Sequence, residues 1–391
     1  MKKFLACALA LITAISFTAC GEPEKVEETT ESSSIIEEIP FDFDEEEPIV
    51  VNPEETEETL EEEALEEVIP PNSYRSELTN QWIPEEIKNQ RPVAIMVDNE
   101  KTALPHFGTS EADIIYELVN STLNGRVTRF MCLVKDWKNL EQFGSIRSTR
   151  PTNCYLFPEY NAILIHDGGP YYINDWLAKP AATNHLSGGF ARFDNGKNWE
   201  YREYVTAEDY TSDGKTYDGL LDRIADAGYD TEYNKYYMGE HFKFSDEEFS
   251  LKDEADAFSC EKIMLPYDHN SSTLTYDEKT KTYIYSEYGD EYVDALHDNC
   301  HLTFKNVIVQ SCAIFQFDEH GYMIYDGIGH PKEEAYYITD GYAIPIEWQK
   351  LSENDITRYY NKATGEEITL NTGKTYITYC PADEWNELIL K

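Results

Sequence analysis

The stretch RPVAIMVDN, residues 91–99, decides the fold class of this chain. Its short apolar run ends at two polar residues, Asp98 and Asn99, and this pattern is typical of a buried strand that leads into a loop. Each of three later apolar stretches is also predicted to be a strand: 112–119, 127–134 and 162–165. A β-sheet is therefore expected in the first half of the chain.

Two helices are predicted among these strands. Residues 151–160 begin with Pro151, and proline is tolerated at the first helical position because its missing N–H has no partner there. Residues 216–228 place three apolar side chains on one face and end at Gly228, which suits a helix C-terminus. Strands interspersed with helices and loops predict an α/β or α+β domain, which we assign to residues 85–250.

The second half of the chain has a different pattern. Segments rich in Thr, Tyr, Val and Ile alternate with short polar turns, and one of these turns, at 371–374, reads NTGK. Such pairs favour hairpins. The segments lie at 273–276, 282–285, 302–317, 335–348, 367–370 and 375–379. We expect a mainly antiparallel β domain over residues 251–391.

The N-terminus resembles an export signal. Two lysines precede an uncharged apolar run at 4–17, which is too short for a permanent bilayer-spanning helix but fits a signal-peptide core. Small residues stand before Cys20 and a glycine follows it, as in the bacterial lipobox, although Phe17 replaces the usual aliphatic residue. We expect residues 1–20 to be a lipoprotein signal peptide and Cys20 to carry the lipid anchor on the extracytoplasmic side of the cell membrane. The alternative is an ordinary cleaved signal with an incidental cysteine.

The charge of the chain is concentrated near its N-terminus. The 391 residues include 75 Asp and Glu against 32 Lys and Arg, a net charge of −43, and −20 of this charge lies in residues 21–80. A segment so acidic and so poor in aromatic residues cannot bury enough apolar surface to fold, so residues 21–84 are predicted to be a disordered tether. Nucleic acid is not an expected partner, because its phosphates require a basic stripe.

Six cysteines remain beyond the signal and the anchor. Their even number permits three disulfides, whereas their positions in apolar, strand-like runs suit buried free thiols equally well. Both states stay open. The spacings contain no CxxC, so a zinc site is not expected.

The polar residues that suit chemistry gather between residues 91 and 175. Arg147 and Arg150 stand three residues apart before the predicted helix at 151–160, and two guanidinium groups at such a place suit a phosphate or a carboxylate. The alternative is that both arginines neutralise nearby acids such as Asp98 or Asp167. His166 ends a predicted strand and is either a general base or a structural residue.

No standard catalytic or cofactor motif is present. The chain lacks GxSxG, HExxH, a P-loop and GxGxxG. Asp98, Asp113 and Glu117 have no tight ligand spacing, so a metal site is not expected. We expect no cofactor.

Several motifs, taken in order, resemble the YerB-like family of bacterial lipoproteins. They are RPVAIMVDN, ADIIYELV with VTRF, GSIRSTRP, YNAILIHDGG, AYYITDGYAIPIEWQK, TRYY and LNTGKTYITYCP. The resemblance covers most of residues 85–385 and departs from the family pattern in the loop at 100–108 and at 194–260. It implies a two-domain extracytoplasmic lipoprotein and brings no established activity.

The resemblance also marks a candidate site. The positions that match the family motifs are Asp98, Asn99, Arg129, Arg147, Arg150 and His166. We expect these residues to form an anion site.

Two functions follow from these patterns. The first is a non-enzymatic lipoprotein that binds an anionic small molecule or a protein partner at the cell envelope, which the tether and the missing catalytic motifs favour. The second is an envelope enzyme acting on a phosphate-containing glycan or a polyprenyl-pyrophosphate carrier, by analogy with LytR–CpsA–Psr enzymes. The enzyme requires both arginines and at least two acids to converge on one concave pocket; the acids are Asp98, Asp113, Glu117 and Asp167.

Overall fold

The computed structural model describes residues 69–212 and 214–391. The predicted signal peptide, the predicted Cys20 anchor and most of the predicted tether lie outside these residues. The last part of the predicted tether, 69–84, is ordered, because Ser73–Arg75 pairs with Trp82–Pro84 and Leu78 is buried. At seven residues, α3 is the longest described α-helix, and no described helix has the length and hydrophobicity of a membrane-spanning segment.

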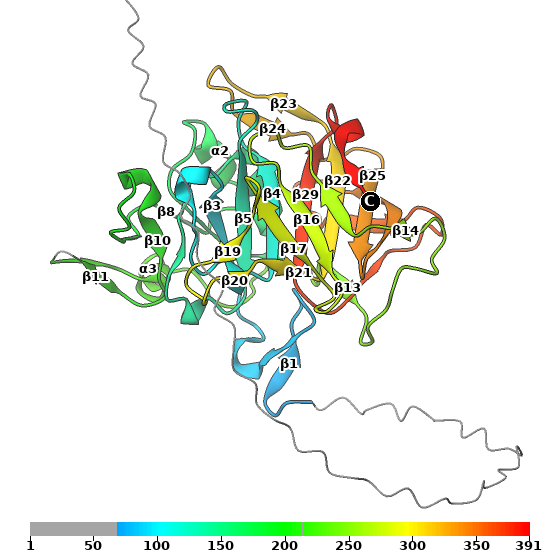
Figure 1. Ribbon diagram of the computed structural model, residues 1–391. Helices are drawn as coiled ribbons and strands as arrows, with labels where there is room; N and C mark the ends of the chain where they lie inside the picture. Colours follow the sequence, from blue (N-terminus) through cyan, green and yellow to red (C-terminus); the bar gives the residue numbers. More distant parts are fainter. Residues whose placement is uncertain (1–68, 213) are drawn as a thin grey trace, which may run out of the picture. The chain divides into compact units, whose positions relative to one another are not determined.

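One mixed sheet of eleven strands runs through the described body (Figure 1). In spatial order its strands are β14 (Phe258–Ser259), β26 (Tyr342–Gln349), β25 (Glu333–Thr339), β22 (Asn306–Cys312), β29 (Thr375–Pro381), β4 (Ile114–Val119), β5 (Thr128–Val134), β3 (Val93–Asp98), β7 (Ile163–His166) and β8 (His185–Ser187), with β27 (Arg358–Asn361) beside β26. Near its middle, β4 from the first half of the chain pairs in parallel with β29 from the second half.

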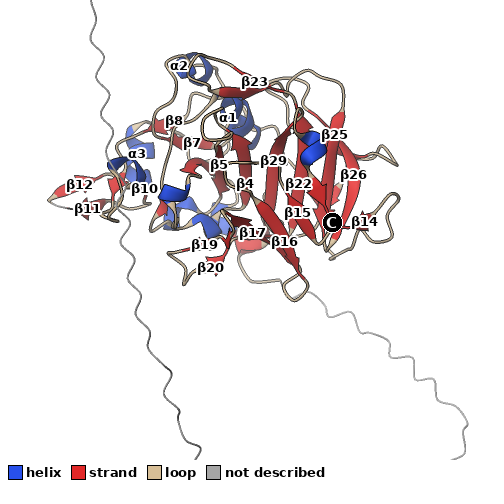
Figure 2. Ribbon diagram, turned by 45° about the horizontal axis from the view of Figure 1, so that its top comes forward, coloured by secondary structure: helices blue, strands red, loops and turns tan. Residues whose placement is uncertain are grey.

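The four strands predicted in the first half are confirmed as β3, β4, β5 and β7. The α/β description of this half holds only loosely, because the structure is mostly β (Figure 2). Its α-helices are short: α1 (Pro151–Leu156), α2 (Ile173–Leu177) and α3 (Leu220–Asp226). The second half is mainly antiparallel, as predicted, although β22 and β29 are parallel.

The two predicted helices are shorter than their sequence patterns. The first begins at Pro151 but changes after α1 into the 3-10 turn η5 (Phe157–Tyr160), because Pro158 has no N–H with which to continue the α-helical hydrogen bonds. The second is α3 alone, because the preceding residues pair in a hairpin of β11 (Tyr210–Ser212) and β12 (Lys215–Tyr217).

A second sheet lies across one face of the first (Figure 1). Its strands are β18 (Asp290–Glu291), β17 (Thr282–Glu287), β16 (Thr273–Asp277), β15 (Lys262–Met264) and β30 (Ile389–Leu390), with β21 (Thr303–Phe304) beside β17. Tyr285 of β17 packs edge-on against Phe130 of β5, with ring centroids 5.6 Å apart. On the opposite face Tyr116 of β4 shares a 2.7 Å hydrogen bond with Tyr160 of η5.

Smaller elements complete the described body. The short strands are β1 (Ser73–Arg75), β2 (Trp82–Pro84), β6 (Phe143–Gly144), β9 (Ala191–Arg192), β10 (Glu203–Val205), β13 (Lys243–Phe244), β19 (Val293–Asp294), β20 (Cys300–His301), β23 (Ile314–Gln316), β24 (Met323–Tyr325) and β28 (Thr369–Leu370). The other 3-10 turns are η1 (Glu85–Ile87), η2 (Lys101–Ala103), η3 (Thr109–Glu111), η4 (Trp137–Asn139), η6 (Trp199–Tyr201) and η7 (Trp385–Glu387).

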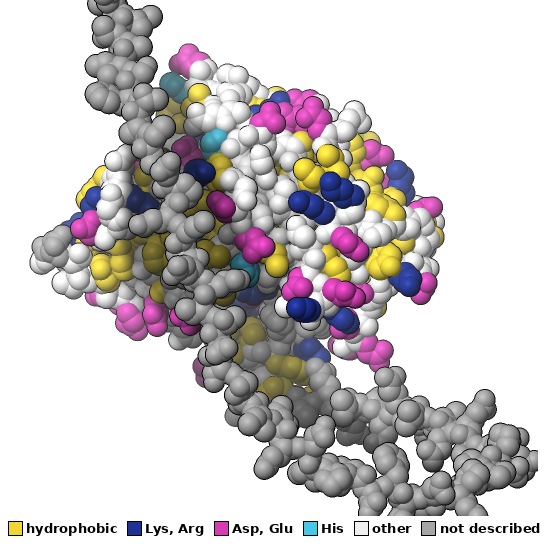
Figure 3. Space-filling model, viewed as in Figure 1, with side chains coloured by type: hydrophobic (Ala, Val, Ile, Leu, Met, Phe, Trp, Pro, Cys, Tyr) yellow, Lys and Arg dark blue, Asp and Glu magenta, His cyan; other side chains and the backbone are white. Residues whose placement is uncertain are grey.

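The six cysteines of the described residues are all free thiols in the structure. Cys300 is exposed and the other five are buried. Of the two states that the sequence left open, the structure has the free one. On the face shown in Figure 3, acidic and basic side chains are mixed with one another.

Candidate functional site

Three parallel strands end at one edge of the main sheet. β3 ends at Asp98, β7 at His166 and β8 at Ser187, and β7 pairs in parallel with both of the others. The carboxyl edge of parallel strands is where α/β sheets place their sites. The segment 145–150 crosses this edge: the Arg147 N–H donates to the carbonyl of Met96 at 2.9 Å, and the Arg147 carbonyl accepts from the Asp167 N–H at 3.0 Å.

Asp98 and Arg147 form an ion pair at this edge. Arg147 Nε lies 2.6 Å from Asp98 Oδ2, and its Nη2 donates to Glu200 Oε2 at 2.7 Å. Burial lowers the pKa of Arg147, but Asp98 and Glu200 outweigh it and the net pKa is raised. This arginine therefore does neutralise acids, as the alternative interpretation predicted.

Arg129 and Arg150 have a different environment. Arg129, opposite Asp98 in the β3–β5 ladder, donates from Nη1 to the Ser148 carbonyl at 2.8 Å. Arg150, only 6% exposed, donates from Nη1 to the Thr149 carbonyl at 2.7 Å, and its Nε has no hydrogen-bond partner among the described residues. Within 69–212 and 214–391, neither guanidinium forms an ion pair with a carboxylate.

The pKa values of the Arg129 and Arg150 guanidinium groups are lowered, because both groups are buried. Burial lowers the pKa of Arg129 to about 10, with nearby Asp98 opposing and Arg147 assisting this shift. Burial and then the Arg129 charge lower the pKa of Arg150 to about 9. Both groups remain positively charged at neutral pH, which is the charge that an anionic ligand requires.

We call Arg129, Arg147 and Arg150 the arginine cluster. Tyr322, from the second half of the chain, covers it: the Arg150 guanidinium lies 3.9 Å from the centroid of the Tyr322 ring. Cation–π contact of this kind holds the guanidinium in place without neutralising its charge. The sequence carried no sign of this contact, because Tyr322 lies in a separate strand-rich segment with no motif around it.

His166 lies beside the arginine cluster and makes structural contacts. Its Nδ1 is 2.7 Å from the Gly168 carbonyl, and its Nε2 is 3.2 Å from His185 Nδ1. Burial lowers the pKa of His166 to about 4, so the ring is neutral at pH 7. Both ring nitrogens have partners, which matches the structural role considered for this residue.

Asn99 lies on the other face of the sheet, because successive residues of a strand point to opposite faces. It donates to Glu117 Oε1 and Thr128 Oγ1 at 3.2 and 2.8 Å. Glu117 is fully buried there and accepts six hydrogen bonds between the two sheets. Its donors are Asn99, Thr128, Asn270, Ser272, Tyr285 and Tyr376.

A second buried carboxyl group adjoins Glu117. Asn270 Nδ2 donates to Glu117 Oε1 at 2.8 Å and to Glu287 Oε2 at 3.2 Å. Burial, followed by the neighbouring Glu117, raises the pKa of Glu287 well above its usual value. This shift favours the protonated form of Glu287, and the shared Asn270 links β4 of the main sheet to β17 of the second sheet.

Of the four acids named by the enzyme hypothesis, two lie near Arg147, which meets the required number, and two lie elsewhere. Asp98 contacts Arg147, and Asp167 reaches Arg147 through its backbone. Glu117 lies in the network just described, and Asp113 accepts the Lys135 N–H at 2.7 Å. Among the described residues no three His, Cys, Asp or Glu side chains are grouped so that they hold a metal ion.

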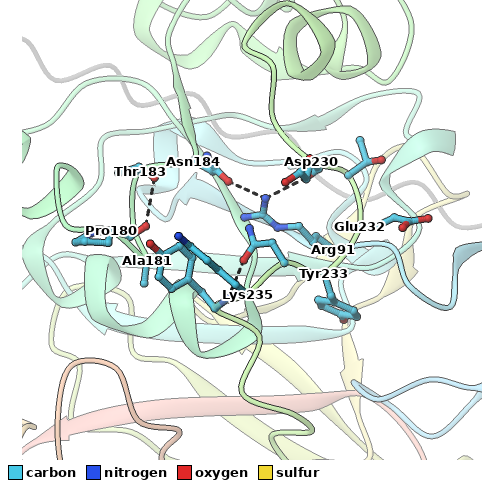
Figure 4. Close-up of a pocket in the computed structure, with 12 residues that line it drawn as sticks. Arg91, Pro180, Ala181, Thr183, Asn184, Asp230, Glu232, Tyr233 and Lys235 are labelled. Carbon is cyan, nitrogen blue, oxygen red and sulfur yellow. Dashed lines mark hydrogen bonds between the residues drawn. The ribbon is translucent and has the colours of Figure 1, made fainter.

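A cavity of about 720 Å³ lies near the opposite, amino edge of the parallel strands (Figure 4). Arg91 lines it, but its guanidinium donates to Asn161 O, Asn184 Oδ1, Asp230 O and Ala162 O at 2.6 to 3.2 Å. An arginine with all three nitrogens bonded to oxygens holds the loops together. Arg150, in contrast, keeps one nitrogen without a partner.

Comparison with known proteins places the chain in a family. "Protein of unknown function (DUF3048) N-terminal domain" matches residues 78–221, and the corresponding C-terminal domain matches residues 263–377. The chain is 29% identical over 126 residues to the protein named "Putative lipoprotein YerB" of Bacillus subtilis (strain 168), which is 32% of this chain and 34% of that protein. The match thus spans about a third of this relative.

A solved structure shares the fold. The crystal structure of YerB protein from Bacillus subtilis has a TM-score of 0.62 and 20% sequence identity, and the match covers 79% of this chain and 97% of that one. Both family domains match in sequence order and together cover most of the described body. The chain therefore belongs to the YerB-like family, whose two domains are described as DUF3048.

Proposed function

We propose that this protein is a membrane-anchored, extracytoplasmic lipoprotein that binds an anionic ligand at the arginine cluster. The observation that supports the proposal is the buried Arg150, which has a free Nε and no carboxylate partner among the described residues. A guanidinium loses several kcal/mol of hydration on burial, and an opposite charge normally compensates for that loss. A phosphate or carboxylate ligand would supply the missing charge.

Binding without catalysis fits the arrangement better than the enzyme hypothesis. Glu117 and Asp113, which would help hold a catalytic metal, have other partners away from the arginine cluster. His166 has both nitrogens engaged. The arginine cluster itself supplies positive charge and hydrogen-bond donors, which suit holding an anion.

Replacement of Arg150 by glutamine is expected to weaken anion binding about tenfold or more, because a charge-assisted hydrogen bond is lost. Calorimetric titration of the full-length protein in detergent with inorganic pyrophosphate and with citrate measures this loss. Arg126→Gln is the matched control, because Arg126 already pairs with Asp383 and Glu384. Equal binding by wild type and Arg150→Gln, or no binding of either anion by the wild type, would contradict the proposal.

The anchor is tested separately. Cys20→Ser removes the only sulfur that the lipobox-like pattern can lipidate, so the protein is expected to leave the membrane fraction for the medium or to stay unprocessed. Fractionation followed by immunoblotting measures this shift. Unchanged membrane association of the Cys20→Ser variant would refute lipid anchoring.

A further inference from the structure

Exposed aromatic rings form a platform beside the arginine cluster. The aromatic platform consists of Tyr171, Tyr172, Phe315 and Phe317. Tyr171 is 85% exposed, Phe315 46% and Phe317 44%. The platform joins the β23–β24 hairpin to the loop before α2, and these elements lie side by side in both ribbon views (Figures 1 and 2). Adjoining exposed rings mark an interaction surface more often than scattered single ones do.

Ring contacts and hydrogen bonds position Tyr172 and Phe317 in the platform. The rings of Tyr172 and Phe317 lie 4.7 Å apart, and those of Tyr171 and Tyr172 lie 5.1 Å apart. The Tyr172 hydroxyl donates to Asp318 Oδ2 at 3.0 Å. Asp318 Oδ1 in turn accepts the N–H groups of His320 and Tyr322, both at 3.0 Å. A preorganised surface loses little entropy when it binds.

The same hairpin reaches the arginine cluster. The Phe317 N–H donates to the Tyr322 carbonyl at 2.7 Å, and the Tyr322 ring lies on the Arg150 guanidinium. Gly321 lets the hairpin lie close to the loop after β4, because at its φ of +85° an added Cβ would lie 2.3 Å from Thr122 Oγ1. The Gly321 carbonyl accepts the Thr122 N–H there at 2.8 Å. The hydrogen bond between Phe317 and Tyr322 and the ring contact with Arg150 therefore link the platform to the arginine cluster.

We infer that the ligand is an anionic glycan, whose charged group binds the arginine cluster and whose sugar rings pack on the aromatic platform. This inference rests on the proposed function. The negative face of an aromatic ring attracts the positively polarised C–H groups on the face of a sugar. The Asp318 carboxylate at the edge of the platform is a hydrogen-bond acceptor for sugar hydroxyl groups.

A membrane surface fits the platform less well. Asp318 and Glu319 stand at the tip of the hairpin, and the Glu319 side chain is 90% exposed. These acids would meet anionic lipid head groups before the rings of Phe315 and Phe317 did. Like charges at such a contact oppose binding.

Calorimetric titration of the full-length protein in detergent tests the inference. Trigalacturonate presents carboxylates, N-acetylglucosamine 1-phosphate presents a phosphate, and neutral chitotriose presents sugars alone. We expect at least one anionic sugar to bind about ten times more tightly than chitotriose. The double variant Tyr171→Ala/Phe317→Ala is expected to bind that sugar about five to ten times more weakly, because two ring contacts are lost.

The controls separate the two proposals. The double variant should bind pyrophosphate and citrate as tightly as the wild type does. The variant Ile389→Ala removes an equally exposed apolar side chain from β30 and should bind every probe like the wild type. The glycan inference alone fails if pyrophosphate or citrate binds while no anionic sugar binds more tightly than chitotriose. It also fails if the double variant retains full sugar affinity, or if the double variant loses affinity for phosphatidylglycerol vesicles instead. If no probe binds, the proposed function fails as well.

Discussion

Replacing Glu117 by alanine is expected to lower the free energy of unfolding by about 4 kcal/mol, because hydrogen-bond donors of both sheets would stay buried without an acceptor. The Tyr376 hydroxyl lies 2.6 Å from Glu117 Oε2, and the Tyr285 hydroxyl lies 3.0 Å from the same oxygen. Neither tyrosine is exposed enough to find water in the folded protein. Urea unfolding followed by intrinsic fluorescence measures the change.

Glu287→Gln is the control for this experiment, because Glu287 holds a proton that an amide can replace. At pH 5 the variant should be about as stable as the wild type. In the unfolded chain Glu287 ionises once the pH exceeds the ordinary pKa of a glutamate, whereas in the folded protein its raised pKa keeps it protonated. The stability of the wild type therefore falls as the pH rises. The variant lacks this loss and should be the more stable protein at pH 8.

Two results would contradict this account of the carboxyl pair. One is a Glu117→Ala protein with wild-type stability, which would mean that the six donors find other partners. The other is a stability difference between Glu287→Gln and the wild type that stays constant from pH 5 to pH 8. In that case Glu287 would not carry the proton assigned to it.

Lys350→Met is expected to be similarly damaging, at about 4 kcal/mol, because it leaves a carboxylate buried without its cation. Lys350 Nζ lies 2.9 Å from Glu159 Oε1, and both side chains are 0% exposed. Burial acts to raise the pKa of Glu159, but Lys350 and then His241 outweigh it and lower this pKa to about 2. Lys350 follows β26 and Glu159 belongs to η5, so this ion pair also joins the two halves of the chain.

The pH dependence of the Lys350→Met effect provides its check. A carboxylate whose pKa is lowered by folding stabilises the folded state at pH values above the pKa that it has in the unfolded chain. This stabilisation disappears as the pH falls toward 2, the pKa of Glu159 in the folded protein. The deficit of the variant should therefore shrink below about pH 4.5 in urea unfolding measurements. Lys362→Met, which breaks the exposed pair with Glu334, should cost less than about 1 kcal/mol. Equal deficits in the two variants would contradict the assignment.

The sequence predicts the strands of this fold well and its helices less well. The apolar runs that form β3, β4, β5 and β7 are short and continuous, and such runs are typical of buried strands. The sequence predicts a helix over 151–160, because the helical spacing of apolar residues continues through Pro158, whereas the α-helix ends at Leu156. Local pattern alone did not show that most connections in the first half would be turns and hairpins.

The candidate site illustrates the same limit. Strand periodicity separates Asp98 and Asn99 onto opposite faces, and the structure places Asp98 beside the arginine cluster and Asn99 beside Glu117. The contact of Arg150 with Tyr322 depends on how two distant segments pack, and no local pattern encodes it. The charge count pointed to the arginines, whereas the platform rings of the second half had no motif to mark them.

The position of β29 has a consequence for the order in which the chain acquires its structure. This strand, which ends ten residues before the C-terminus, fills the gap between β4 and β22 in the middle of the main sheet. Until the ribosome has made β29, β4 keeps an unpaired row of amide and carbonyl groups on that side. We therefore expect the middle of the main sheet to form only after β29 has been synthesised, and the unpaired edge of β4 to need protection from aggregation until then.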